Sequence, residues 1–555
     1  MCPTGPFQGL RLFAVACALA CAGTGCLTPE KAERDAEETA RELATAYWRA
    51  QTGLTNDFVV SRPADALTLK IALEAVRQGV TNAIFPKIEG VDPLAPGSNG
   101  LVRLSLADAL ALGARNSRHY QTLKETVYVK ALALDTERYA FDTKFTGFLL
   151  GALAGEPEIY KNSVGGGAGV SRKLENGTTI AGNLAVDIVR MLRDDWHSTG
   201  LTGDLTVSVP LLRGAGRDIV REPLTQAERN LAYALFAFTR YRQTYALSVA
   251  KAYYSVLEYA QNRRNSDDNA RRLEQNWDRA EMMFKAGRMD RIQVDQAKTD
   301  LLAARQTIIT KQQSYEDALD SFKIALGLAP EAPIALKDEE LMRLEDEMAA
   351  CATNRPHALA DFPDETTALN IALTRRVDLA ATRGDVADCE RALAVAADAL
   401  KADITVEGGG EINEERRQHH PYGGTESTFA RLRIDLPWDR RRERNAYRKA
   451  QIDLDQSRRA FEEAEDNVKN EVRAGYRDLV AARALYENKM ESLRTARMRV
   501  ESNDLFMQSG RSSMRDILEA ESAMLTARNA LCSAVISWRI SELSLRTAMG
   551  TLEVR

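Results

Sequence analysis

One sequence pattern occurs twice in this chain of 555 residues. The stretch "GRMDRIQVDQAKTDLLAARQTI" begins at Gly287, and the stretch "GRSSMRDILEAESAMLTARNAL" begins at Gly510. Shared residues lie 223 positions apart, and a further glycine follows each start after 40 positions, at Gly327 and Gly550. Each copy covers roughly 200 residues, far more than a solenoid unit, so the pattern predicts an internal duplication and not a repeat array.

Each copy contains a long stretch without helix breakers before the repeated pattern. Residues 224–286 hold neither glycine nor proline, and residues 438–509 hold no proline and one glycine. At 1.5 Å per residue such helices would be rods of roughly 90–105 Å. Apolar residues in the second stretch follow steps of three and four, as in a coiled coil. A glycine suits the left-handed cap of a helix, so Gly287 and Gly510 are predicted as the tips of helical hairpins.

Strands are predicted before each long helix, because apolar and other residues alternate there with period two. In "TFARLRIDLPW", leucine and isoleucine at 432, 434 and 436 alternate with Arg431, Arg433 and Asp435. In the first copy Thr206 and Ser208 alternate with leucine and valine in the same way. Helices are predicted upstream of these strands. Their start signals are Ser105 with Asp108 in the first copy, a capping box, and Asp364 or Thr366 in the second.

Residues 1–25 have the composition of a secretory signal, with Arg11 ahead of an apolar stretch of small residues. Gly-Thr-Gly-Cys, ending at Cys26, resembles a bacterial lipobox, which predicts a lipidated cysteine as the mature N-terminus. Gly23 stands where lipoboxes usually have leucine, and Cys21 is a competing site. Ordinary cleavage without a lipid is the third possibility. Residues 26–100 are then an N-terminal extension, in which "EKAERDAEETARELATAYWRAQ" is predicted to be helical.

Composition and motifs give no sign of catalysis or nucleic-acid binding. The net charge is −5, unlike that of a nucleic-acid-binding domain. Cys351, Cys389 and Cys532 have neither disulfide nor zinc spacing. The five histidines form no HExxH motif, and "VGGGAGVSR" lacks the spacing of a phosphate loop and is predicted to be a strand. We therefore expect no enzyme, with no catalytic residue, cofactor or metal site. An enzyme with an unrecognised site stays open as an alternative.

Five segments in order resemble the TolC-like outer-membrane efflux proteins. They are "LSLADALALGARNS", "LTVSVPLLRGAG", "LRIDLPWDRRRERN" and the two tip segments "AGRMDRIQVDQAKTDLLAAR" and "SGRSSMRDILEAESAMLTARNAL". The resemblance covers roughly residues 100–330 and 364–550. It implies a mainly α fold with a membrane β-barrel portion, in which a strand pair and a long helical hairpin are duplicated. The repeats are then 101–349 and 350–555.

The resemblance also implies a function and partners. Three chains would form one barrel in the outer membrane and one helical tunnel across the periplasm, a homotrimer in contact with outer-membrane lipid. This trimer would be the passive channel of a tripartite efflux or type I secretion system, working with a periplasmic adaptor (membrane fusion protein) and an inner-membrane pump. Arg431, Arg433 and Asp435 would face the barrel lumen. The sequence does not identify the exported substrate.

The tips would be the periplasmic gate, where the family's second copy often carries an inward acidic ring. Asp516 and Glu519 occupy those two positions here, and Gln293 and Asp295 fall in the corresponding turn of the first copy. An acidic ring attracts cations and can bind a plugging polyvalent ion. The alternative is that these acids merely stabilise the first turn of a helix through its dipole. A Tyr and an Arg that latch the tip in some relatives are replaced here by Met507 and Ser512.

The first copy is longer than the second between its opening helix and the proline that precedes its long helix. Tyr120 and Pro210 are 90 positions apart, whereas Leu379 and Pro437 are 58 positions apart, an excess of 32 positions. The additional residues contain "SVGGGAGVSRKLENGTTIAGNLAV", which is predicted to form an added hairpin because Asn176-Gly177 is a strong turn signal. Whether this hairpin joins the barrel or caps it from outside stays open.

One other function and one other fold also stay open. One is a periplasmic structural coiled coil or adaptor without channel activity. The other is a soluble sandwich, in which the polar side of the predicted strands would be its one wet face.

Overall fold

The computed structural model describes residues 28–53, 57–58, 102–156, 159–191, 197–337, 339–344, 346, 364–417, 420–436, 438–509 and 511–553. The predicted lipidation sites Cys26 and Cys21, and the predicted tip residue Gly510, lie outside these ranges. The chain forms two compact units. The first comprises Met1–Val59, Glu125–Leu235 and Asp388–Leu454, and the second Val60–Lys124, Phe236–Ala387 and Asp455–Arg555. Each unit therefore contains residues of both repeats.

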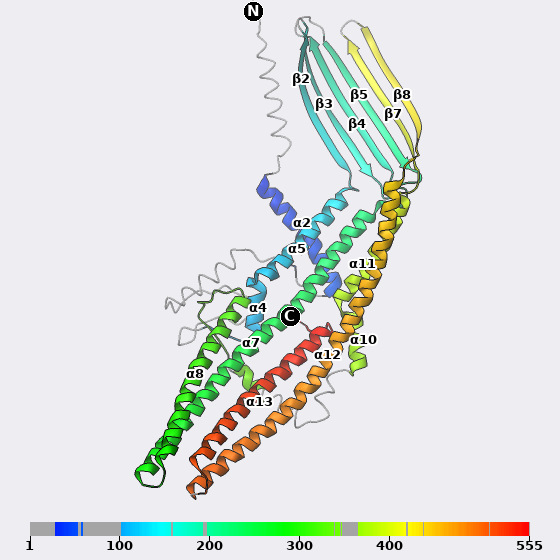
Figure 1. The fold of residues 1–555 in the computed structure, drawn as a ribbon. Helices are drawn as coiled ribbons and strands as arrows, with labels where there is room; N and C mark the ends of the chain where they lie inside the picture. The colour runs from blue at the N-terminus through cyan, green and yellow to red at the C-terminus, as the bar shows by residue number, and fades with distance from the viewer. Residues whose placement is uncertain are drawn as a thin grey trace, which may run out of the picture. The chain divides into compact units, whose positions relative to one another are not determined.

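The predicted duplication is visible in the helix lengths (Figure 1). The first repeat contains α4 (Leu106–Asn116), α5 (Arg118–Tyr139), α7 (Glu222–Lys285) and α8 (Arg291–Ala325). The second contains α10 (Glu365–Arg375), α11 (Val377–Asp398), α12 (Arg441–Gln508) and α13 (Met514–Ala548). Both members of the pairs α4 and α10, α5 and α11, and α8 and α13 have 11, 22 and 35 residues. The two copies thus repeat the same helices almost residue for residue.

The two long helices are confirmed. With 64 and 68 residues, α7 and α12 are about 96 and 102 Å long. After α7, Gly287 takes a left-handed φ of 70°, and the N–H of Arg288 donates to the carbonyl of Met283 at 2.9 Å. The equivalent bond after α12 runs from Arg511 to Phe506 at 2.8 Å. The first tip therefore ends in the turn that glycine permits at a helix C-terminus, and the second tip makes the equivalent backbone hydrogen bond.

The start signals are confirmed at Ser105, which forms a full capping box with Asp108 on α4. In the second repeat Asp364 is the N-cap of α10, but its side chain makes no capping hydrogen bond there. Between the two hairpins at their tips lies an apolar core from α7, α8, α12 and α13. Its members include Ala280, Val294 and Met514, which are almost fully buried.

A six-stranded antiparallel sheet lies within the first unit (Figure 1). Its order is β2 (Lys144–Glu156), β3 (Ile159–Lys173), β4 (Thr179–Met191), β5 (His197–Pro210), β7 (Asp403–Arg417) and β8 (His420–Asp435). The predicted strand pair of the second repeat is β7 and β8. The predicted added hairpin is β3 and β4, and it pairs along its whole length with β2 on one side and β5 on the other. The hairpin is therefore an internal part of this sheet.

The remaining elements are short or terminal. The predicted N-terminal helix is confirmed as α2 (Pro29–Thr52), which is capped at its start by Thr28. A single turn, α6 (Arg217–Val220), precedes α7, and β1 (Val102–Leu104) pairs in parallel with β6 (Ile334–Leu336). Among the described residues, no helix combines the length and the apolar composition needed to cross a membrane.

Candidate functional site

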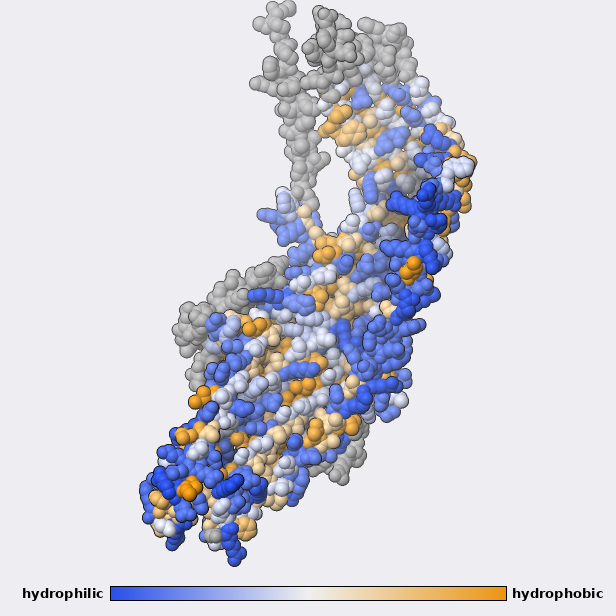
Figure 2. Space-filling model, viewed as in Figure 1, coloured by the Kyte–Doolittle hydropathy of each residue, from blue (hydrophilic) through white to orange (hydrophobic). Residues whose placement is uncertain are grey.

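One face of the six-stranded sheet is apolar and yet exposed. Residues that lie opposite one another in the antiparallel register share a face. In the register Leu432 of β8 pairs with Val406 of β7, and Phe145 of β2 lies in one row with Val170 and Leu205. Apolar side chains on this face that are 37–80% exposed in the single chain are Phe145, Leu149, Val170, Ile180, Leu184, Val186, Ile188, Leu205, Val406, Ile412, Leu432 and Ile434. Figure 2 shows apolar residues lying open on the sheet.

The opposite face of the sheet is mainly polar. It carries the residues predicted to face a lumen, Arg431, Arg433 and Asp435, together with Thr206 and Ser208. The guanidinium of Arg433 pairs with Asp435 at 3.0 Å, while Arg431 lies 3.8 Å from the carboxylate of Glu407. The alternation predicted from the sequence therefore divides the sheet into one apolar and one polar side, except on β2, whose exposed Phe148 and Leu150 lie on the otherwise polar side.

Three exposed acids on the polar face were not singled out from the sequence. Asp187 is on β4, Asp204 on β5 and Glu411 on β7, and the last two lie directly opposite each other in the register. Asn183 donates to Asp204 at 3.1 Å. Only the strand register, which joins segments of the two repeats, brings Asp204 and Glu411 together. The alternation along a single strand predicts which face of the sheet each acid lies on. It does not predict that Asp204 and Glu411 lie opposite each other.

The predicted gate residues lie near the starts of α8 and α13, at the two tips. Gln293 and Asp516 are in the first turns of these helices, and Asp295 and Glu519 are in the second turns. The carboxylate of Asp516 accepts hydrogen bonds from the N–H and the hydroxyl of Ser513, at 2.9 and 2.6 Å. These bonds from Ser513 lower the pKa of Asp516. The capping interpretation thus describes what Asp516 does within one chain. Its carboxylate is also exposed and charged, so a role in a gate stays a prediction.

The other three gate residues are held differently. Glu519 forms an ion pair with Arg499 of α12 at 3.4 Å, and Asp295 forms one with Arg291 at 3.1 Å. Gln293 lies in the first turn of α8, whose N-cap Asp290 makes no side-chain capping bond. The capping box at Ser513 therefore has no counterpart at the first tip.

A cavity of about 440 Å³ lies next to these tips, between α7, α8 and α13. Polar groups from all three helices line it, among them Asn269, Asp300 and Glu519. Burial raises the pKa of Asp300. Met507, which stands where some relatives have a latch residue, is buried in the neighbouring apolar core. This position is thus part of the packing between the hairpins and offers no polar group for a latch.

In the first repeat, the C-terminal end of α8 meets a group of aromatic rings. Tyr120 packs against Phe238 at 5.3 Å and against Tyr245 at 5.6 Å between ring centroids, and Tyr241 stacks on Tyr245 at 5.7 Å. The hydroxyl of Tyr245 donates to the carbonyl of Ala325, the last residue of α8, at 3.1 Å. Burial raises the pKa of Tyr245 to about 12. We call this group, with Gly327, the aromatic junction.

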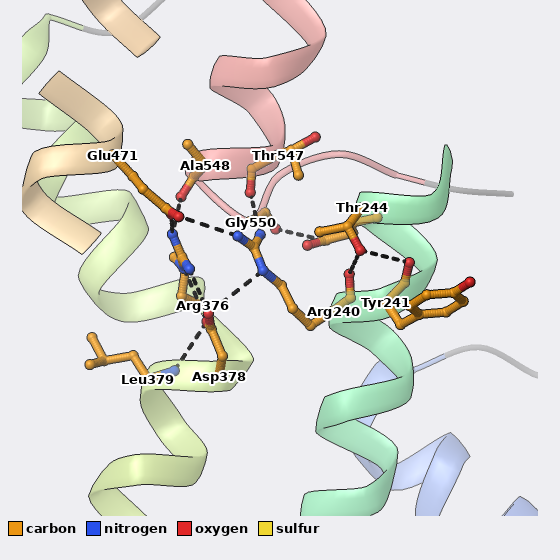
Figure 3. Close-up of polar contacts among 11 residues, drawn as sticks. Arg240, Tyr241, Thr244, Arg376, Asp378, Leu379, Glu471, Thr547, Ala548 and Gly550 are labelled. Carbon is orange, nitrogen blue, oxygen red and sulfur yellow. Dashed lines mark hydrogen bonds and ion pairs between the residues drawn. The ribbon is translucent and has the colours of Figure 1, made fainter. Parts of the chain in front are cut away.

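In the second repeat, the C-terminal end of α13 meets charged side chains (Figure 3). Arg376, only 6% exposed, donates to Asp378, to Glu471 and to the carbonyl of Ala548. Arg240 of α7 donates to the carbonyl of Thr547 at 2.6 Å and lies near both acids. Burial opposes the ionisation of Asp378, but the hydrogen bonds and charge of Arg376 outweigh it, so the pKa of Asp378 is lowered. We call this group, with Gly550, the ionic junction.

Comparisons with known proteins agree with this geometry. The profile of the family described as "Outer membrane efflux protein" matches residues 189–328 and 368–551, and the first of these matches begins inside β4. A search of curated proteins found no match.

Solved structures have a similar fold. CusC is 14% identical, with a TM-score of 0.56, covering 81% of this chain and 93% of that one. VceC from Vibrio cholerae is 13% identical, with a TM-score of 0.56, covering 80% and 96%. The open state of the MtrE channel of Neisseria gonorrhoeae is 13% identical, with a TM-score of 0.54, covering 80% and 88%. At such identities these likenesses speak for the fold alone. The family match spans more than half of the 555 residues, and on that ground the chain belongs to the outer membrane efflux protein family.

Proposed function

We propose that three copies of this chain form the outer-membrane channel of a tripartite efflux system, a passive conduit across the periplasm and the outer membrane. The observation that carries the proposal is the sheet. Its apolar face is exposed in the single chain, its other face is mainly polar, and its end strands β2 and β8 each have one unpaired edge within the described sheet. Open edges are not tolerated in lipid, where every backbone group needs a partner. Pairing β8 of one copy with β2 of the next would satisfy them.

The two faces of the sheet suit such a closure. The apolar face would contact lipid, and the polar face with Arg431, Arg433 and Asp435 would line a watery lumen. A periplasmic coiled coil or adaptor has no use for a whole row of exposed apolar side chains on one side of a sheet. Family membership supports the efflux role, and the sequence feature at Cys26, or alternatively Cys21, supports a lipid anchor in the outer membrane.

We further propose that the tips of α7–α8 and α12–α13 form the periplasmic gate and the contact with the adaptor of an inner-membrane pump. Asp516 and Glu519, three positions apart, lie on one side of α13. Three copies of both would gather six carboxylates around an axis, which attracts cations. Gln293 and Asp295 would stand at the same level on α8.

The gate can be tested in planar bilayers with the full-length, detergent-extracted protein. Asp516→Asn combined with Glu519→Gln should reduce cation selectivity and abolish block by polyvalent cations. Ser513→Ala is the matched control: it removes the hydroxyl of the capping box and keeps both charges. This control should lower the stability of the tip while leaving selectivity in place.

Two results would contradict this function. If the charge-neutralising pair leaves selectivity and block unchanged, the acids only cap and brace the helix. If the wild-type protein makes no conducting pore and fractionates with soluble periplasmic proteins, the periplasmic structural alternative is the correct one.

A further inference from the structure

The hairpin formed by β3 and β4 has no counterpart in the second repeat. There the chain passes directly from β7 to β8, whereas the first repeat places two more strands between β2 and β5. The first repeat thus contributes four strands to the sheet and the second contributes two. The hairpin could be a flap that packs outside a barrel, or it could be part of the barrel wall.

The strand register places the hairpin in the wall. Every residue of β2 pairs with β3, and β4 pairs with β5 from Thr179 to Arg190. Phe145 of β2, Val170 of β3, Gly182 of β4 and Leu205 of β5 follow one another in a single row. No strand of the hairpin slips by one residue, which would have reversed its faces.

The side chains of the hairpin follow the two faces of the other strands. Its apolar residues Ile180, Leu184, Val186 and Ile188 are 37–55% exposed and lie on the same face as Leu205. Its polar residues Asn183 and Asp187 lie on the polar face, opposite Gly169 and Gly165 of β3. A Cβ at either glycine would meet the side-chain oxygen of its partner, at 2.4 Å for Gly169 and 2.0 Å for Gly165. The glycines of β3 thus leave room for the polar side chains of β4.

The turn of the hairpin is fixed to the residues that lead from β5 into the long helix α7. Gly177 has a φ of 93°, and a Cβ there would meet Pro210 at 2.9 Å and the carbonyl of Gly214 at 2.8 Å. Glu175 forms ion pairs with Arg217 at 2.9 Å and with Arg221 at 3.8 Å. A loosely attached flap would not be packed and paired at this end.

We infer that the β3–β4 hairpin is a section of the barrel wall, and that three chains close a barrel of three times six, or 18, strands. This inference rests on the proposed trimeric channel. With strands about 4.8 Å apart and tilted by about 40°, 18 strands enclose a backbone radius of about 18 Å. The same calculation for four strands per chain, without the hairpin, gives about 12 Å. The hairpin thus more than doubles the cross-section of the membrane pore and suits it to wider cargo.

The hairpin widens only the membrane part of the conduit. The number of long helices in each repeat is unchanged by the hairpin, so the helical part does not widen with the barrel. Cargo selection by size would then take place at the tips, and the barrel would add little resistance of its own. Single-channel conductance is for this reason a poor measure of strand number, and the wall itself has to be probed.

The inference can be tested at pairs of neighbouring residues whose side chains lie on opposite faces of the sheet. Four single-cysteine variants, Asn183→Cys and Leu184→Cys on β4, and Asp204→Cys and Leu205→Cys on β5, are made in a chain whose Cys351, Cys389 and Cys532 are alanine. Whole cells are treated with a membrane-impermeant maleimide. We expect labelling at 183 and 204 and protection, by at least tenfold, at 184 and 205. The β5 pair is the control, because β5 is in the wall whether or not the hairpin is.

The outcomes separate this inference from the proposed function. Suppose that on β5 position 204 is labelled and position 205 is protected, while both β4 positions are labelled. The hairpin then lies outside the barrel and the inference is wrong. If positions 204 and 205 of β5 are labelled to the same extent, the proposed function as a membrane barrel is itself wrong. Images of the extracted particle give a second measurement: a backbone radius of about 18 Å is expected, falling to about 12 Å when residues 159–191 are deleted. The smaller radius in the intact chain would overturn the inference even if the deletion variant does not fold.

Discussion

At equivalent ends of their helical hairpins, the first repeat packs aromatic rings and the second packs charged side chains. The carbonyl of Ala325 closes α8 by accepting from Tyr245, and the carbonyl of Ala548, 223 positions later, closes α13 by accepting from Arg376. A cation suits the negative end of a helix, and a buried hydroxyl can make the same bond without a charge. The backbone geometry of the duplicated unit is thus kept while its chemistry differs.

The turn that follows each helix shows what the two junctions still share. Gly327 and Gly550 have φ values of 74° and 70°, and the N–H groups of Leu328 and Thr551 each donate back to the preceding helix at 2.9 Å. Because this turn requires a positive φ, glycine is needed in both copies. The aromatic and ionic side chains are two different solutions packed around one backbone turn.

The largest expected effect in this comparison comes from Gly327→Ala. An alanine at a positive φ costs roughly 1–2 kcal/mol at either site. At Gly327, the new Cβ would in addition overlap with the backbone carbonyl of Asn116, whereas at Gly550 the nearest atom, the carbonyl oxygen of Arg375, is 3.4 Å away. We expect Gly327→Ala to lower the midpoint of thermal unfolding clearly more than Gly550→Ala does. The midpoint is measured by circular dichroism in detergent. Equal losses would show that the junctions are packed equally tightly.

The second effect concerns the ionic junction. Arg376→Met keeps most of the length of the side chain and removes its bonds to Asp378, Glu471 and Ala548. Loss of one partner from a fully buried ion pair costs about 3–5 kcal/mol, but both acids here are partly exposed and stay hydrated. We expect about 1–3 kcal/mol, measured by denaturant unfolding. A neutral or stabilising Arg376→Met would mean that packing alone holds α13 at this end.

Alkaline pH should weaken the aromatic junction. The pKa of Tyr245 is about 12 in the folded chain and 10 as its ordinary value. The protonated hydroxyl therefore favours folding fully below pH 10, and this contribution is lost as the pH rises through 12. Tyr245→Phe should cost about 1 kcal/mol at neutral pH and flatten the loss of stability between pH 10 and 12. Tyr139→Phe, at an exposed position, is the control and should change neither quantity.

Acid pH should weaken the ionic junction, with the smallest effect of the four. In the folded chain the pKa of Asp378 is lower than its ordinary value of 3.8, because Arg376 donates hydrogen bonds to it and carries the opposite charge. Its carboxylate therefore stabilises the fold above about pH 4, and this contribution is lost as the pH falls below that value. In Asp378→Asn the decline of stability below pH 4 should be shallower than in the wild type. If the two profiles run parallel, the carboxylate is not coupled to folding.

Local patterns were enough to predict much of this fold. The helices and the capping box at Ser105 depend on residues a few positions apart, and these predictions are confirmed. The alternation on β8 likewise predicted its polar side. The location of the added hairpin depends on pairing between β2, β3, β4 and β5, which no local pattern fixes.

The ionic junction shows the same limit for side chains. Arg240, Arg376, Glu471 and Ala548 come from separate segments that lie far apart in the sequence, so their meeting could not be read from any one of them. At the tip, the motif around Asp516 predicts a helix cap and an acidic ring equally well. The helix cap is formed within a single chain, whereas an acidic ring would need Asp516 from several copies of the chain.

The central claim is that several copies of this chain together close one channel in the outer membrane. Its most direct test is the mass of the particle extracted from outer membranes in mild detergent, measured by native mass spectrometry. The account predicts a complex of three chains, each with a mass of 61.4 kDa minus that of the predicted secretory signal. A stable, folded monomer in the same preparation would contradict it, because one six-stranded sheet would then keep both of its edges open.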